Sequence, residues 1–161
     1  FTGMIITGFE AKLTASVALT AFIPMLMDTG GNAGGQTSAT IIRSLSLGDI
    51  RLKDMLKVLW KEMRVAVICG VVLAAVNFVK ILLVDRLLLG NTDITAMVDL
   101  VVCLTLVVAV FIAKVIGCVL PIGAKAIGFD PAVMASPFLT TIVDAISLLA
   151  YFLIATALLK I

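Results

Sequence analysis

Long apolar runs separated by short polar breaks dominate the pattern of this chain. The apolar runs at residues 65–84, 94–121 and 132–159 are each at least about as long as the roughly 20 residues that a helix needs to cross a bilayer. An earlier run, 13–42, contains Pro24 and a glycine-rich stretch. It predicts one long helix that is kinked or partly unwound there. The pattern therefore predicts four complete membrane spans.

Two further segments do not fit a complete span. The apolar stretch 1–9 is too short to cross a bilayer, and we interpret it as the tail of a first helix. In residues 47–64, apolar side chains recur at helical spacing among charged ones. This pattern predicts an amphipathic linker helix at the membrane surface, with Trp60 near the lipid headgroups. Residues 1–161 are thus expected to form a single transmembrane domain.

Composition supports an all-α, polytopic membrane bundle embedded in the lipid bilayer. Apolar residues make up 62% of the 161 residues and charged ones 14%, against roughly 45–50% and 25% in soluble domains. Soluble, disordered and disulfide-rich secreted classes are therefore excluded, and no nucleic-acid partner is expected. The chain has no histidine, and its three cysteines form no CxxC pair. Histidine-based catalysis and thiolate metal sites are therefore not expected.

The basic residues predict the orientation of the chain in the membrane. Six of the twelve lysines and arginines fall between residues 43 and 64, and connections rich in these residues stay on the cytoplasmic side. The linker 43–64 is therefore predicted to be cytoplasmic, whereas the loop 85–93 and the C-terminus are predicted to lie outside. The chain is expected in the plasma (inner) membrane as a multi-pass protein.

One carboxylate lies near the middle of the last apolar run, at Asp144. A charged group at that depth costs roughly 3 kcal/mol even on lenient insertion scales, so it indicates a function by default. Polar side chains follow it along one helical face: Ser136, Thr140, Asp144, Ser147 and Tyr151. Such a line faces either a polar pathway or a partner helix that it binds through hydrogen bonds. A mid-membrane carboxylate favours the pathway.

A second polar line occurs in the earlier run, where Asp28, Asn32, Gln36 and Thr40 recur every four residues. Glycines between them, including Gly31, would let another helix or an ion approach the backbone closely, and would free carbonyls where the helix loosens. The ligands on offer are all oxygens, which suits hard cations such as Mg²⁺ and Ca²⁺. Mg²⁺ keeps several of its waters, so a wide polar site with few carboxylates fits this ion.

Two motifs resemble the signatures of the MgtE family of magnesium channels and transporters. The first is Pro-Met-Leu-Met-Asp-Thr-Gly-Gly-Asn-Ala-Gly-Gly-Gln at residues 24–36, and the second combines Phe-Asp-Pro-Ala at 129–132 with Ser136-Pro137, Thr140-Thr141 and Asp144. The resemblance implies a homodimer with five membrane helices per subunit and a pore on the dimer axis, lined by the second and fifth helices. It also implies a hydrated Mg²⁺ centred on Asp144, with Thr140, Ser136 and Asn32 nearby.

The predicted metal site also includes Gly31, through its backbone, and Asp28, in addition to Asp144, Thr140, Ser136 and Asn32. The carboxylate of Asp28 either binds the ion near the pore entrance or serves only in packing.

Members of the family usually carry a cytoplasmic N domain and paired CBS domains, which we expect to be absent from this chain together with most of the first helix. Gating by those domains is therefore not readable from this sequence.

Two mechanisms of transport remain open. A Mg²⁺-selective channel needs only the membrane potential, whereas a secondary cation transporter with a broken helix needs a coupling ion and could use Lys80 or Lys114 as a counter-charge.

Asp28-Thr29-Gly30 also spells the triplet of aspartic proteases, but those enzymes hold it on a β-loop of a soluble fold. No strands are predicted here, and the protein is not expected to be an enzyme.

Overall fold

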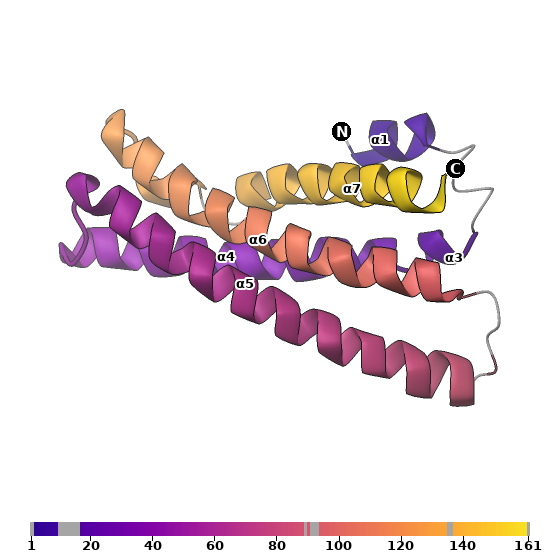
Figure 1. Ribbon diagram of the computed structural model, residues 1–161. Helices are drawn as coiled ribbons and strands as arrows, with labels where there is room; N and C mark the ends of the chain where they lie inside the picture. The colour runs from indigo at the N-terminus through magenta and orange to yellow at the C-terminus, as the bar shows by residue number, and fades with distance from the viewer. Residues whose placement is uncertain (1, 10–16, 89, 91–93, 135–136, 161) are drawn as a thin grey trace.

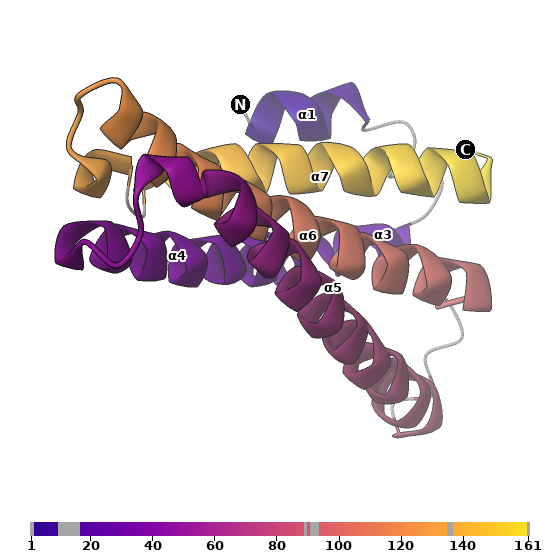
Figure 2. The same cartoon turned by 60° about the vertical axis from the view of Figure 1, so that its left-hand side comes forward.

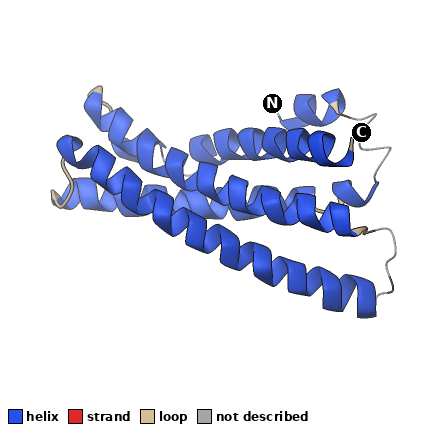
Figure 3. Cartoon of the chain, in the orientation of Figure 1, coloured by secondary structure: helices blue, strands red, loops and turns tan. Residues whose placement is uncertain are grey.

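The computed structural model describes residues 2–9, 17–88, 90, 94–134 and 137–160, and nearly all of these residues are helical. The described part contains no strand (Figure 3). In chain order the elements are α1 (Thr2–Gly8), α3 (Val17–Thr20), α4 (Ile23–Leu47), the short turn η1 (Leu52–Asp54), α5 (Met55–Lys80), the π-helical η2 (Ile81–Leu88), α6 (Ala96–Ala126), the turn η3 (Pro131–Met134) and α7 (Pro137–Leu159). The predicted all-α class is confirmed.

Three helical segments of the described residues are long and apolar enough to cross a membrane: Leu52–Leu88, Ala96–Ala126 and Pro137–Leu159. The chain is therefore a multi-pass membrane protein. Helix α4 has 25 residues and is about 37 Å long at 1.5 Å per residue, which is also enough to cross the hydrocarbon core. Its glycines and polar side chains make it less apolar than the other three.

Helix α6 occupies the middle of the bundle and packs against α4, α5 and α7 (Figure 1). Helix α4 also packs against α7, and α1 lies along α7. Both views show α5 leaving the bundle toward its C-terminal end (Figure 2). The exposed face of α5 carries a row of apolar side chains, including Ile68, Val72 and Val76. Such a face is suited to contact with lipid.

The main hydrophobic core joins α3, α4, α6 and α7 near the end of the bundle where the chain terminates. Leu19, Leu26, Val102, Tyr151 and Phe152 are all buried there. The Tyr151 hydroxyl donates a hydrogen bond to the carbonyl of Leu19 at 2.8 Å. This core therefore holds the beginning of α4 against the second half of α7.

The linker and the third span form one continuous helix, whereas the sequence predicted a surface helix at 47–64 and a separate span at 65–84. Gly48 ends α4 with a φ of 78°, a left-handed conformation that glycine adopts without steric penalty. After η1, α5 runs from Met55 to Lys80 without interruption. No proline interrupts this stretch, so nothing local stops the helix at the junction between charged and apolar residues.

The other predicted helix bounds also shift. The turn before α4 falls at residues 21–22, next to Pro24, and α4 is regular through all of its glycines. The helix predicted at 94–121 extends to Ala126, with Pro121 inside it. The helix predicted at 132–159 begins at Pro137, after η3; residues 135 and 136 lie outside the described part.

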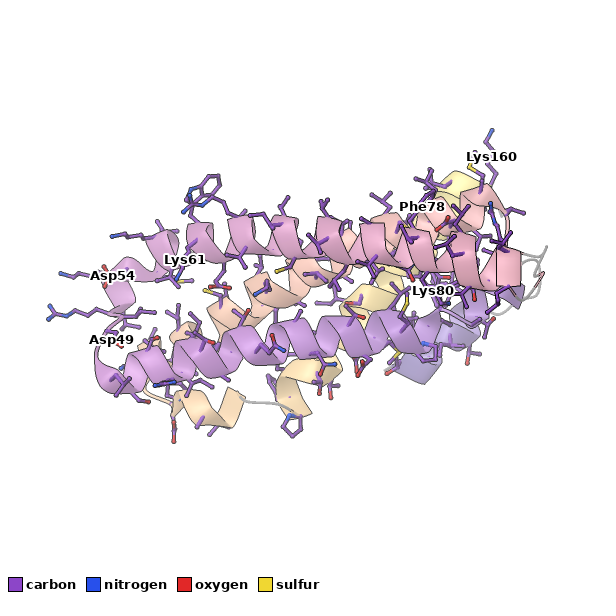
Figure 4. The ribbon with its side chains drawn as sticks, turned by 90° about the horizontal axis from the view of Figure 1, so that it is seen from below. Asp49, Asp54, Lys61, Phe78, Lys80 and Lys160 are labelled. Atoms are coloured by element: carbon purple, nitrogen blue, oxygen red, sulfur yellow. The ribbon has the colours of Figure 1, made fainter. Side chains whose placement is uncertain are left out.

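The connections divide between the two ends of the bundle. Asp49, Asp54 and Lys61 lie at one end, and Lys80 and Lys160 at the other (Figure 4). The turn after α6 shares the first end with the α4–α5 connection, and the end of α5 shares the second with the chain terminus (Figure 1). This arrangement places the basic linker and the C-terminus at opposite ends.

Candidate functional site

The polar line of α4 is exposed along its whole length in the single chain. Asp28, Asn32, Gln36 and Thr40 are all exposed, because a step of four residues advances only about 40° around a helix of 3.6 residues per turn. The opposite face of α4, including Gly30 and Gly34, is buried. The packing of α4 onto α6 and α7 therefore uses its small residues and leaves its polar residues uncovered.

A small cleft between α4 and α7 brings the two sequence motifs together. Its volume is about 160 Å³, and it is lined by Met27, Asp28, Gly31, Asn32, Thr140 and Asp144. Five of the predicted metal-site residues thus line one cleft, namely Asp28, Gly31, Asn32, Thr140 and Asp144. The sixth, Ser136, lies outside the described residues. The cleft combines carboxylate, carboxamide and hydroxyl oxygens, which are ligands suited to hard cations.

Gly31 determines how closely α4 approaches the polar residues of α7. A Cβ atom at this position would lie 3.5 Å from Thr140 Cγ2 and 3.7 Å from Asp144 Oδ1. A methyl group would therefore fit, but it would enter the cleft beside the carboxylate. The small residue keeps the space next to Asp144 open.

The expectation of loosened backbone carbonyls near Gly30 and Gly31 is wrong. Both residues lie inside the regular helix α4, so their carbonyl groups take part in the helix rather than being free. The glycines are used instead for close helix packing, which does not require unwinding. The oxygen atoms that the cleft offers come mainly from the side chains of Asp28, Asn32, Thr140 and Asp144.

The polar line of α7 serves two purposes. Thr140 and Asp144 line the cleft, whereas Ser147 and Tyr151 are completely buried. Ser147 packs against α4, since a Cβ on Gly30 would lie 3.1 Å from its Oγ, and Tyr151 bonds to Leu19. The interpretation as a hydrogen-bonded helix–helix contact is therefore borne out at Tyr151, whereas Ser147 packs against α4 without a hydrogen-bond partner for its hydroxyl among the described residues. The divide arises because the start of α4 and helix α3 cover the second half of α7.

Three helices are joined by a polar cluster that the sequence analysis missed. Lys114 of α6 lies 3.4 Å from the carboxylate of Glu62 on α5 and donates a hydrogen bond to Thr37 Oγ1 on α4 at 3.0 Å. The side chains of Lys114 and Glu62 are only 13% and 14% exposed. Glu62 is far away in sequence and lies in a segment predicted to be at the membrane surface, so periodicity could not identify the pair.

The second lysine weighed as a counter-charge is also paired. The ammonium of Lys80, the last residue of α5, lies 2.7 Å from the carboxylate of Asp85 in η2. The same ammonium is 5.9 Å from the centre of the Phe22 ring. Neither Lys80 nor Lys114 lines the α4–α7 cleft.

No group of three or more Asp, Glu, Cys or His side chains in the described part of the chain is arranged to hold a metal ion directly. The cleft of one chain supplies two carboxylates, those of Asp28 and Asp144. This donor set suits an ion that keeps part of its water shell, or a site that a second subunit completes.

Comparison with known proteins places the chain in one family. The sequence model of the MgtE family, described as divalent cation transporter, matches residues 23–154. A protein named magnesium transporter MgtE from Thermus thermophilus is 36% identical over 159 residues, which are 99% of this chain and 33% of that protein. Proteins of the same name from Bacillus subtilis and Enterococcus faecalis are 36% and 30% identical over 155 residues, 96% of this chain and 33% and 32% of theirs.

The chain thus spans about a third of the length of the curated relatives it matches. The matched region contains α4, α5 and α6, most of α7, and every described residue of the cleft. Over this region, the chain belongs to the MgtE family of divalent cation transporters.

Proposed function

We propose that this chain conducts Mg²⁺ across the membrane and that the α4–α7 cleft is half of the ion pathway. The observation that carries the proposal is that Asp28 and Asn32 of α4 line one cleft together with Thr140 and Asp144 of α7. The names of the curated relatives, magnesium transporters, agree with the ion. A carboxylate within a membrane helix is retained where it meets an ion or water rather than lipid.

A second copy of the chain would complete the pathway as a homodimer. The exposed line from Asp28 to Thr40 is unfavourable against lipid, and a two-fold axis beside it would cover the line and double its carboxylates. Next to the cleft, α7 carries an apolar groove of about 600 Å³, lined by Pro137, Phe138, Thr141, Ile142, Ala145 and Ile146. The groove offers a surface on which the partner could pack while the polar residues face the axis.

The ion would be held with much of its water shell. Mg²⁺ dehydrates reluctantly, and two Asp144 carboxylates across the axis would attract it, while Thr140, Asn32 and Ser136 would orient its waters. A cavity matched to the octahedral hydrated ion would select against Ca²⁺, which is larger and loses water more readily. Two charges crossing 100 mV gain about 4.6 kcal/mol, so the membrane potential suffices to drive uptake.

Between the two mechanisms left open, the geometry favours a channel. A secondary transporter would need a mobile counter-charge near the ion. The two candidates, Lys80 and Lys114, are instead engaged in ion pairs with Asp85 and Glu62, outside the cleft. Helix α4 is also regular where it lines the cleft, whereas such transporters bind ions where a helix is broken. Inward flux that follows an imposed potential and is indifferent to a pH gradient would support the channel.

The test replaces Asp144 by Asn, which keeps the shape of the side chain and removes its charge. In proteoliposomes with an imposed potential, we expect Asp144→Asn to abolish Mg²⁺ flux or its selectivity over Ca²⁺ while the protein stays folded. Asp49→Asn is the matched control, since Asp49 is exposed in the loop after α4, and its flux should equal that of the parent. Parental Mg²⁺ flux and Ca²⁺ competition in Asp144→Asn would show that the cleft is not the ion site.

A further inference from the structure

Two adjoining hollows lie beside the first half of α5, away from the cleft between α4 and α7. Their lining residues come from α5, α6 and the connection between α4 and α5. The first is an apolar groove of about 380 Å³, lined by Trp60, Met63, Arg64, Val67, Ile68 and Phe111. The second is a polar hollow of about 570 Å³, lined by Asp49, Ile50, Asp54, Lys57, Val58, Trp60, Lys61 and Arg64. They share Trp60 and Arg64, so an apolar surface continues directly into a basic one.

The helical register of α5 produces this arrangement. Lys57, Lys61 and Arg64 are spaced by four and three residues, which places them on one face of the helix. Val67 and Ile68 follow one turn later along the same face. Figure 4 shows Lys61 at the same end of the bundle as Asp49 and Asp54. The basic residues thus lie where the membrane span meets its polar boundary.

The charge of the polar hollow favours an anionic occupant. Lys57, Lys61 and Arg64 are exposed and enter no ion pair among the described residues. Of the two acidic side chains in the hollow, Asp54 accepts a hydrogen bond from the backbone N–H of Arg51 at 3.1 Å, so it helps to start the helix. The positive charges therefore exceed the negative ones.

We propose that this pair of hollows binds an anionic phospholipid. One acyl chain would lie in the apolar groove between α5 and α6, against Val67, Ile68 and Phe111. The phosphodiester would be bound by Lys57, Lys61 and Arg64, and Trp60 would pack at the level between headgroup and chain, where tryptophan is enriched. Basic pockets between membrane helices are a known mode of binding anionic headgroups. An apolar partner helix would satisfy the groove but not the basic hollow.

Trp60 provides the readout, because it is the single tryptophan of the chain and it lines both hollows. In vesicles of phosphatidylcholine, a small fraction of phosphatidylglycerol with brominated acyl chains should quench its fluorescence more than the same fraction of brominated phosphatidylcholine. We expect a preference of about fivefold or more, given the attraction of three basic side chains to an anionic headgroup. Equal quenching by the two lipids would overturn the proposal.

Matched variants separate a site from general attraction to the membrane. The triple variant Lys57→Gln, Lys61→Gln, Arg64→Gln should lose the preference. The control Arg43→Gln, Arg51→Gln, Lys53→Gln removes the same charge from exposed positions in the last part of α4 and in the α4–α5 connection and should keep the preference. Loss of the preference in the control as well would mean bulk electrostatics, and its persistence in the site variant would exclude these side chains. Either result would overturn the proposal.

A variant that changes no charge tests the apolar half. Val67→Phe should fill the groove and reduce quenching by brominated phosphatidylglycerol, whereas Val76→Phe, further along the exposed face of α5, should not. Trp60 emission shielded from both lipids would indicate a second protein copy as the occupant and would contradict lipid binding. Mg²⁺ flux is not used in any of these measurements, so failure here leaves the proposed function standing.

Discussion

Gly34 of α4 and Gly117 of α6 bring their two helices into backbone contact. A Cβ atom on Gly117 would collide with the carbonyl oxygen of Gly34 and would lie only 3.1 Å from the carbonyl carbon of Gly34. Gly34 is also close to α6, since its own Cβ would lie 3.0 Å from the carbonyl oxygen of Ala113. This crossing sets the position of α4, and with it the side of the ion cleft that carries Asp28 and Asn32.

Gly117→Ala should therefore destabilise the fold. The obstacle is backbone and cannot move aside as a side chain could, so we expect a loss of at least about 2 kcal/mol, within the range seen for overpacking. Gly123→Ala is the control, because the same helix has nothing within 4 Å of a Cβ at that position. It should be neutral or more stable by up to about 1 kcal/mol. Thermal unfolding in detergent measures both, and equal melting temperatures would contradict the close crossing.

The Lys114–Glu62 pair should be sensitive to the loss of one partner and tolerant of losing both. Lys114→Met or Glu62→Met alone leaves a poorly solvated charge, at an expected cost of about 3–5 kcal/mol. The double variant should recover most of that loss, because two apolar side chains of similar volume replace the pair. A double-mutant cycle on unfolding in detergent checks this. Additive effects would mean that the two side chains do not interact.

Gly31→Ala should impair ion flux and spare the fold. Its methyl group would make ordinary contacts with Thr140 and Asp144 at 3.5 and 3.7 Å, but it would occupy part of a cleft of about 160 Å³. We expect Mg²⁺ flux to fall about tenfold, which corresponds to about 1.4 kcal/mol. Gly35→Ala, with nothing within 4 Å of its Cβ, should conduct like the parent. Similar flux in both variants would argue against a pathway beside Gly31.

Tyr151→Phe should weaken the contact between α3 and α7. The variant keeps the ring in the core and removes the hydroxyl that bonds to the Leu19 carbonyl at 2.8 Å. Since the carbonyl is then left without this donor in a buried setting, we expect a loss of about 1–3 kcal/mol. The melting temperature reports it. Tyr151→Leu should lose more, because it also removes aromatic packing against Phe152.

The basic linker should lie on the cytoplasmic side. Lys57→Cys near the start of α5 and Lys160→Cys just after α7, each in a background without Cys69, Cys103 and Cys118, introduce single thiols. Figure 4 shows Lys61, one turn after Lys57, and Lys160 at opposite ends of the bundle. An impermeant thiol reagent applied to intact cells should label position 160 and not position 57. The reverse labelling would invert the orientation, and labelling of both would refute the transmembrane arrangement.

Several properties follow from the sequence alone because they depend on composition and local spacing. An apolar content of 62% leaves too few polar side chains to cover a soluble fold, so membrane insertion and helical structure do not depend on long-range contacts. The four-residue spacing from Asp28 to Thr40 is likewise a property of any regular helix, and the mid-span Asp144 indicates function by its depth. The family motifs at 24–36 and 129–144 add the ion class.

Only the tertiary structure decided which polar residues meet. Thr140, Asp144, Ser147 and Tyr151 share one line in the sequence, yet two line the cleft and two are buried, because α3 and the start of α4 cover one half of α7. Lys114 and Glu62 are 52 positions apart, and no periodicity links residues on different helices. The Gly34–Gly117 crossing is also a long-range event: small side chains permit close approach at many places, and packing of the whole bundle selects which pair makes contact.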